Sequence, residues 1–286
     1  MTEEESFRIK IEGPSFNENG TSLNELLKVY SAIDGLFEST HSNIAGYEKY
    51  TKINRNPYQI IINEAKIGSW DSYLKILIAV SPALFNQGLT PKDYLETIFV
   101  TYEFLNSIFT LRKKGEKYRL NVNGSGNRIE IIKENNVTNI YNAPVTINLV
   151  ANAQKSLPDY REIADILKSG NMTSLKINSS NSSKSIKLTS EDANLFDLVE
   201  SRSSEIKIVY GEIYRFNKRT RTGKIHISEA DGIVPGKYTF SVKKDNQIDI
   251  ILSMQKNEGT FSVLEIFIED PITGKQILDS LEIVDL

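Results

Sequence analysis

Alternation of apolar and polar residues in the last third of the chain is the feature that most constrains the fold. From Glu205 onward the alternation has a period of two, and turn sequences such as Asp270-Pro271-Ile272-Thr273-Gly274 break it into short runs. Such runs indicate strands with one buried face, because successive side chains point to opposite sides of a sheet. Six strands are predicted, at 206–216, 223–228, 237–242, 247–254, 260–269 and 277–284. They favour a small, nearly closed antiparallel β-barrel over 204–286.

The first part of the chain mixes helix and strand signals. A capping-box sequence followed by apolar residues at helical spacing predicts a helix over 22–39. A Thr-Pro-Lys-Asp sequence at 90–93 supplies an N-cap, a first-turn proline and an acid for a second long helix. Alternating residues at 7–12 and a β-rich run at 58–62 predict strands. An α+β domain is therefore expected over 1–115.

Asparagine is concentrated in the middle of the chain. Nine of the 32 residues from 121 to 152 are asparagine, interleaved with apolar residues. Asparagine and glycine accept turn conformations, so two to four short strands are expected in a β connector over 116–155. Strands this short need a partner, which is either another part of the chain or a second copy. We expect Ile140 and Ile147 to contribute to self-association, which makes the protein a homo-oligomer.

The segment between the connector and the barrel, 156–203, is predicted to be mainly helical. Apolar spacing indicates short helices at 158–168 and at about 191–199. A serine- and asparagine-rich stretch at 178–184 is expected to form an exposed loop between them.

Composition excludes several classes of chemistry. The chain has no cysteine, which removes disulfides, thiolate nucleophiles and cysteine-bound metals, and is compatible with a cytoplasmic location. Its 34 basic and 37 acidic residues give a net charge of −3, which argues against a general polyanion binder. The acidic N-terminus at 1–5 does not resemble a signal peptide, and the apolar stretch at 73–85 is too short to span a membrane.

Catalytic motifs are weak. His41 lies near a predicted helix end and His226 on a predicted strand facing outward, and no nucleophile accompanies either. Asp159 with Glu205 and Lys207 matches a metal-dependent nuclease pattern only loosely, because a helix start and a loop replace the expected hairpin. Phosphate-binding glycine loops are absent from the sequence. We therefore expect a non-enzymatic protein without a metal or cofactor, with a nuclease as the third hypothesis.

The strongest local feature is a basic hairpin at 214–224. It combines two aromatic residues, Tyr214 and Phe216, with five cations. The cations are Arg215, Lys218, Arg219, Arg221 and Lys224. A small barrel can bind single-stranded nucleic acid with such a set. Alternatively, the cations are a solvated turn whose two aromatics both point into the core, or a docking site for an acidic protein.

Several segments together resemble a family of uncharacterised proteins carried by bacterial genomes, prophages and phages. The segments are the opening strand, the helix 23–37, the Ile67-Gly68-Ser69 step, the basic helix end at 112–115, the asparagine-rich 137–142 and the barrel opening at 210–217. Size and architecture are also similar to the phage anti-Gabija inhibitors. The resemblance implies a counter-defence protein that binds and blocks a host antiviral nuclease complex in the host cytoplasm. The runner-up is a nucleic-acid-binding module using the hairpin.

Overall fold

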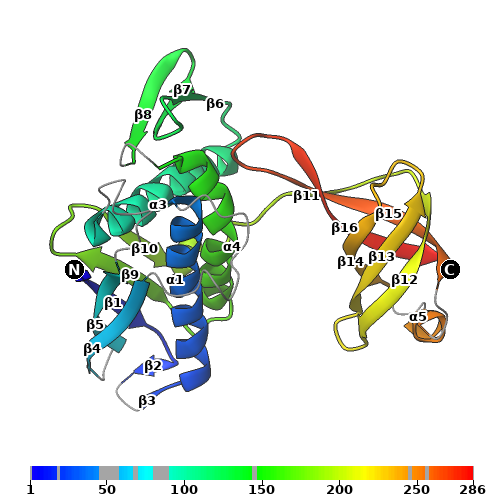
Figure 1. Ribbon diagram of the computed structural model, residues 1–286, viewed down its shortest axis with the longest axis horizontal. Coiled ribbons are helices and arrows are strands. Elements are labelled where there is room, and N and C mark those ends of the chain that lie inside the picture. The colour runs from blue at the N-terminus through cyan, green and yellow to red at the C-terminus, as the bar shows by residue number, and fades with distance from the viewer. Residues whose placement is uncertain are drawn as a thin grey trace. The chain divides into compact units, whose positions relative to one another are not determined.

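The computed structural model shows an α+β chain with two compact units, Met1–Asp197 and Leu198–Leu286, termed here the N-terminal unit and the barrel unit (Figure 1). The described residues are 2–17, 20–44, 58–66, 70–79, 90–143, 147–243, 247–254 and 258–285. The Ile67-Gly68-Ser69 step lies outside them. Among the described residues, no helix is both long enough and apolar enough to cross a membrane.

A five-stranded antiparallel sheet forms one layer of the N-terminal unit. Its order is β10-β9-β1-β5-β4. The bounds are Thr2–Glu12 for β1, Tyr58–Lys66 for β4, Trp70–Ala79 for β5, Ser174–Ser179 for β9 and Ser185–Thr189 for β10. Alternation in β1 buries Phe7, Ile9 and Ile11, because one face of the sheet is covered. A short hairpin, β2 (Phe16–Asn17) and β3 (Gly20–Thr21), follows β1.

Three helices form the second layer. They are α1 (Leu23–Ile44), α3 (Pro91–Lys113) and α4 (Leu149–Lys168). α1 packs against α4, and α3 contacts both helices as well as β1 and β10 (Figure 1). The predicted cap of α3 is confirmed, because the Asp93 carboxylate accepts from the Thr90 amide at 2.8 Å and the Thr90 hydroxyl accepts from the Asp93 amide at 3.4 Å.

The asparagine-rich segment divides into a sheet and a helix. An antiparallel sheet joins β6 (Arg119–Asn123), β7 (Arg128–Lys133) and β8 (Asn136–Asn142), and Ile140 on β8 is 49% exposed. The expectation of strands up to 152 is wrong, because α4 begins at Leu149, where the Asn148 carboxamide oxygen caps the Ala151 amide at 3.0 Å. Ile147 lies before this helix, outside any strand, and is fully buried. It therefore offers no surface for self-association.

The segment predicted as 156–203 lies almost wholly in the N-terminal unit. α4 continues through Pro158, nine residues into the helix, so the predicted start at 158 is wrong. The serine-rich loop joins β9 to β10, and this hairpin completes the sheet. The predicted helix at 191–199 is also wrong, because only a 3-10 turn forms at Ser190–Asp192 before strand β11 (Glu200–Arg202).

The barrel unit is a closed five-stranded barrel. Its strands are β12 (Lys207–Asn217), β13 (Thr222–Ala230), β14 (Gly236–Val242), β15 (Gly259–Glu269) and β16 (Gln276–Asp285). They pair in the order β12-β13-β14-β16-β15, and β15 returns to β12 to close the barrel. β11 pairs with residues 266–268 of β15, beyond the part of β15 that pairs with β12.

Two features of the barrel differ from the antiparallel prediction. β14 and β16 run parallel, so the barrel is mixed. The segment predicted as a strand at 247–254 is helix α5 (Gln247–Ser253). Because β15 pairs with β12 rather than β14, the chain must cross the barrel after β14, and α5 lies in this crossing with Ile250 buried in the barrel core.

Candidate nucleic-acid interface

The loop between β12 and β13 is held by its own backbone and one asparagine. The Asn217 side-chain oxygen accepts from the Arg219 amide at 3.0 Å and from the Thr220 amide at 3.3 Å. Arg221 closes the loop with a left-handed φ of 58°, and its amide donates to the Asn217 carbonyl at 2.8 Å. The Val242 amide donates to the Arg221 carbonyl at 3.0 Å, which ties the loop to β14. The basic loop is therefore anchored to the barrel.

Close contact between strands at the loop end depends on Gly223. A Cβ atom there would lie 2.4 Å from the Arg215 carbonyl oxygen and 2.4 Å from Cζ of Phe240. Without a side chain at 223, the Phe240 ring fills the space and stacks on Phe216, with the ring centroids 6.1 Å apart. Gly223 thus allows aromatic packing directly beneath the basic loop.

An irregularity in β12 places Tyr214 and Phe216 on different faces of the strand. The register with β13 shifts between Ile213 and Arg215, so Tyr214 and Arg215 are both exposed while Phe216 packs against the barrel core. The expectation that Tyr214 and Phe216 share an inward face is therefore wrong. Tyr214 is 44% exposed, and the Lys237 Nζ atom lies 5.9 Å from the centroid of its ring. Its ring is available on the outer surface of the barrel.

Strand pairing gathers further cations around this tyrosine. Arg215 pairs with Lys224, and Lys224 donates from Nζ to Thr239 on β14 at 2.6 Å. Lys237 on β14 lies beside Tyr214, and Lys243 directly follows Val242, which bonds to Arg221; neither lysine was identified from the sequence. We define the basic face as Tyr214 and seven cations, all of them exposed: Arg215, Lys218, Arg219, Arg221, Lys224, Lys237 and Lys243.

Electrostatics of the barrel unit are uneven. Residues 198–286 contain fourteen acidic and twelve basic side chains, so the unit is not basic as a whole. The ion pairs of its described residues, Arg202 with Glu282 at 2.9 Å and Lys207 with Glu265 at 2.8 Å, involve none of the basic face. Within the described part of the chain, none of the cations of the basic face forms an ion pair with a carboxylate.

The two histidines occupy different surroundings. His226 is exposed on β13, as predicted. His41 is buried in the last turn of α1, with Nδ1 at 2.8 Å from the Tyr94 hydroxyl, and burial lowers its pKa to about 4. His41 is therefore neutral at physiological pH and belongs to the packing of the N-terminal unit.

Residues of the loose nuclease pattern are divided between the two units. Asp159 lies on α4 of the N-terminal unit, whereas Glu205 and Lys207 lie in the barrel unit, where Lys207 pairs with Glu265. Burial raises the pKa of Asp159 to about 6, and the Ser39 hydroxyl donates to its carboxylate at 3.1 Å. Within the described ranges, no group of three or more His, Asp or Glu residues is placed to hold a metal ion.

Comparison of the chain with protein-family models, curated proteins and solved structures finds no match. The resemblance to phage-carried proteins and to anti-Gabija inhibitors therefore stays a prediction.

Proposed function

We propose that the barrel unit binds single-stranded nucleic acid through the basic face. The observation that carries this proposal is the exposed Tyr214 ring, with Lys237 beside it, on an outer surface of β12, β13 and β14 whose described cations form no ion pair. Cations of this kind bind phosphates, and an exposed aromatic ring stacks on a base. Both contacts are independent of base identity, so binding with little sequence preference is expected.

Barrel topology gives independent support. A five-stranded barrel with the order 1-2-3-5-4, a parallel third and fifth strand and a helix after the third strand has the arrangement of oligonucleotide- and oligosaccharide-binding barrels. In those barrels, strands two and three and the loop after strand one contact the ligand. The equivalent parts here are β13, β14 and the loop at 217–222, which carry most cations of the basic face, whereas Tyr214 and Arg215 lie on β12.

An acidic protein partner would use the same cations, and the counter-defence hypothesis predicts a protein partner. The two ligands differ in what they require from Tyr214. A nucleic acid gains roughly 1–3 kcal/mol from each stacked base, and this gain does not depend on salt. An acidic protein surface needs the charges but has no base to stack on the ring.

The test is binding of a fluorescein-labelled oligothymidylate of about 15 nucleotides, followed by anisotropy between about 50 and 200 mM salt. The variant with serine at Arg215, Lys218, Arg219 and Arg221 should reduce the log-log salt slope by about 3, since each phosphate contact contributes roughly 0.7. Tyr214→Ala should weaken binding roughly 10- to 100-fold with an unchanged slope.

Matched controls use side chains outside the basic face. A control variant removes the same charge from the N-terminal unit and should leave binding unchanged. It carries serine at four exposed lysines, Lys113, Lys114, Lys176 and Lys187. Tyr210→Ala removes a tyrosine of similar exposure, 46%, from the other half of β12. The proposal would be refuted if the four-serine variant of the basic face and the four-serine control variant weaken binding equally. It would also be refuted if the unmodified protein does not bind the oligothymidylate at about 50 mM salt.

A further inference from the structure

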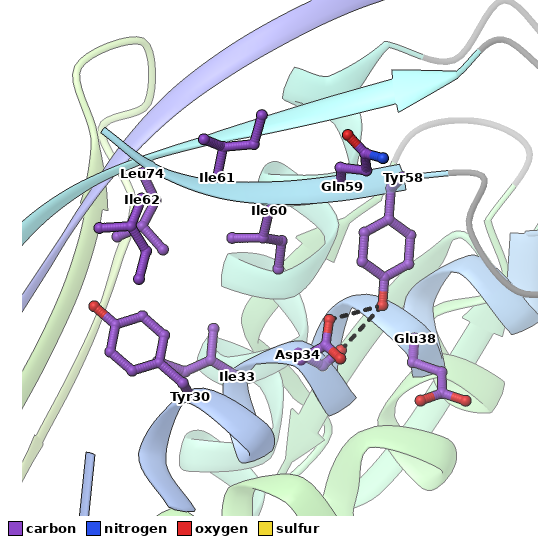
Figure 2. Close-up of a pocket in the computed structure, with 10 residues that line it drawn as sticks. All are labelled: Tyr30, Ile33, Asp34, Glu38, Tyr58, Gln59, Ile60, Ile61, Ile62 and Leu74. Atoms are coloured by element: carbon purple, nitrogen blue, oxygen red, sulfur yellow. Dashed lines mark hydrogen bonds between the residues drawn. The ribbon is translucent and has the colours of Figure 1, made fainter. Parts of the chain in front are cut away.

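A cavity of about 660 Å³ opens between α1 and the edge strand β4 of the N-terminal unit. Figure 2 shows Tyr30, Asp34 and Glu38 along one side of it, on α1, with Tyr58 and Ile60 pointing toward them from β4. The three α1 residues are spaced four apart, so they form one row on the helix surface. The cavity is therefore a groove between a helix face and a sheet edge.

The sheet side of the groove is mainly apolar, whereas the helix side carries the acids. Ile60 and Leu74 lie on the sheet side, and the carboxylates of Asp34 and Glu38 lie along the helix side together with Ile33 (Figure 2). No lysine or arginine is found among the described residues that line it.

Each carboxylate keeps acceptor capacity. The Tyr58 hydroxyl donates to Asp34 at 3.1 Å, and Glu38 makes no hydrogen bond or ion pair within the described part of the chain. The charges of both acids also contribute, after burial, to the raised pKa of Asp159 on α4, so the region is electrostatically negative.

Strand β4 is the last strand of the sheet and lies beside this groove. Among the described residues, it pairs only with β5. Ile61 is 40% exposed and Ile62 is 50% exposed, which is unusual for the edge of a sheet, because an apolar open edge tends to pair with another chain.

We propose that an extended peptide segment of a partner protein adds to the outer edge of β4 and places a lysine or arginine in the groove. Backbone groups of the added strand would pair with β4, and side chains of alternate residues would point toward α1. The aliphatic stem of the basic residue would cover Ile60, and its charged head would reach Asp34 and Glu38. This inference is independent of nucleic-acid binding, because it concerns the N-terminal unit alone.

The test is selection from a random peptide library displayed on phage, using the full chain as bait. The selected peptides should alternate β-branched residues with at least one lysine or arginine. The double variant Asp34→Asn/Glu38→Gln should weaken their binding roughly tenfold or more, since charge-assisted hydrogen bonds are lost. The control Glu191→Gln removes an exposed carboxylate elsewhere in the N-terminal unit and should leave binding unchanged.

Two further arms separate strand addition from capture of a cation alone. N-methylation of alternate backbone amides in a selected peptide preserves its side chains and should abolish binding. Agmatine, which carries a guanidinium group without a peptide backbone, should bind far more weakly than the peptide. The proposal would be overturned if no peptide is selected or if the selected peptides lack basic residues. It would also be overturned if binding is insensitive to the double variant or to N-methylation, or if agmatine binds as tightly as the peptide. Thermal unfolding of the double variant must match that of the unmodified protein.

Discussion

Replacing Asp159 with asparagine is expected to stabilise the N-terminal unit above pH 6 and to leave it unchanged in acid. The Asp159 carboxyl lies against the α1 backbone at Gly35, where an added Cβ would be 2.2 Å from Oδ1, and it accepts from Ser39. Burial raises its pKa from 3.8 to about 6. The folded state therefore binds this proton more tightly than the unfolded state.

The magnitude follows from proton linkage. A group whose pKa is raised on folding contributes stability at low pH, and that contribution is lost as pH rises from about 4 to about 6. A shift of about two units corresponds to about 3 kcal/mol. Because the carboxyl is partly solvated, we expect a gain of about 1–2 kcal/mol for Asp159→Asn at about pH 8. Asparagine keeps the shape and the acceptor for Ser39 but carries no charge.

Urea unfolding followed by the fluorescence of Trp70, the single tryptophan, measures this difference. Variant and unmodified protein are compared at about pH 8 and about pH 4, with Glu191→Gln as the control for a general charge effect. A gain of equal size at both pH values, or no gain at the higher one, would show that desolvation of Asp159 does not limit stability.

Three further predictions concern packing and assembly. Because burial lowers the pKa of His41 to about 4, the neutral imidazole contributes stability above pH 6.5, and this contribution is lost as pH falls toward 4. His41→Gln should flatten this acid dependence in urea titrations at several pH values, and an unchanged profile would contradict the prediction. Gly35→Ala should lower the free energy of unfolding by about 1–3 kcal/mol, and a loss just as large in an Asp159→Ala background would exclude the clash as its cause. Light scattering of the unmodified protein should give a molar mass of at least twice 32.3 kDa, and a monomer at micromolar concentration would end the self-association hypothesis. Ile140→Pro on the exposed β8 should reduce that mass, whereas Ile147→Asn should unfold the N-terminal unit.

Local patterns predicted the elements whose signals do not depend on distant contacts. Helices α1 and α3 follow from capping residues and apolar spacing, and most barrel strands follow from period-two alternation, so both could be found from the sequence. The run from Val145 to Leu149 also alternates, yet α4 begins at its end, because a short alternating run does not distinguish a strand from a helix start. The same ambiguity affected the segment that forms α5.

The candidate site also combines residues that the sequence identified with residues that only the fold brings together. The five cations of the hairpin at 214–224 were identified from the sequence because they are neighbours in the chain. Lys237 was not, because it reaches Tyr214 only through the pairing of β13 with β14. The separation of Tyr214 from Phe216 depends on a register shift in β12, which turns Phe216 toward the core without leaving a signal in the sequence alternation.

By itself, the sequence determined the α+β class, the barrel at the C-terminal end, helices α1 and α3 and the charge of the hairpin, because these depend on composition and local periodicity. Tertiary structure alone decided the parallel pairing of β14 with β16, the assembly of the basic face across three strands and the groove between α1 and β4. These features join residues far apart in the chain, so strand order and packing, rather than any local pattern, bring them together.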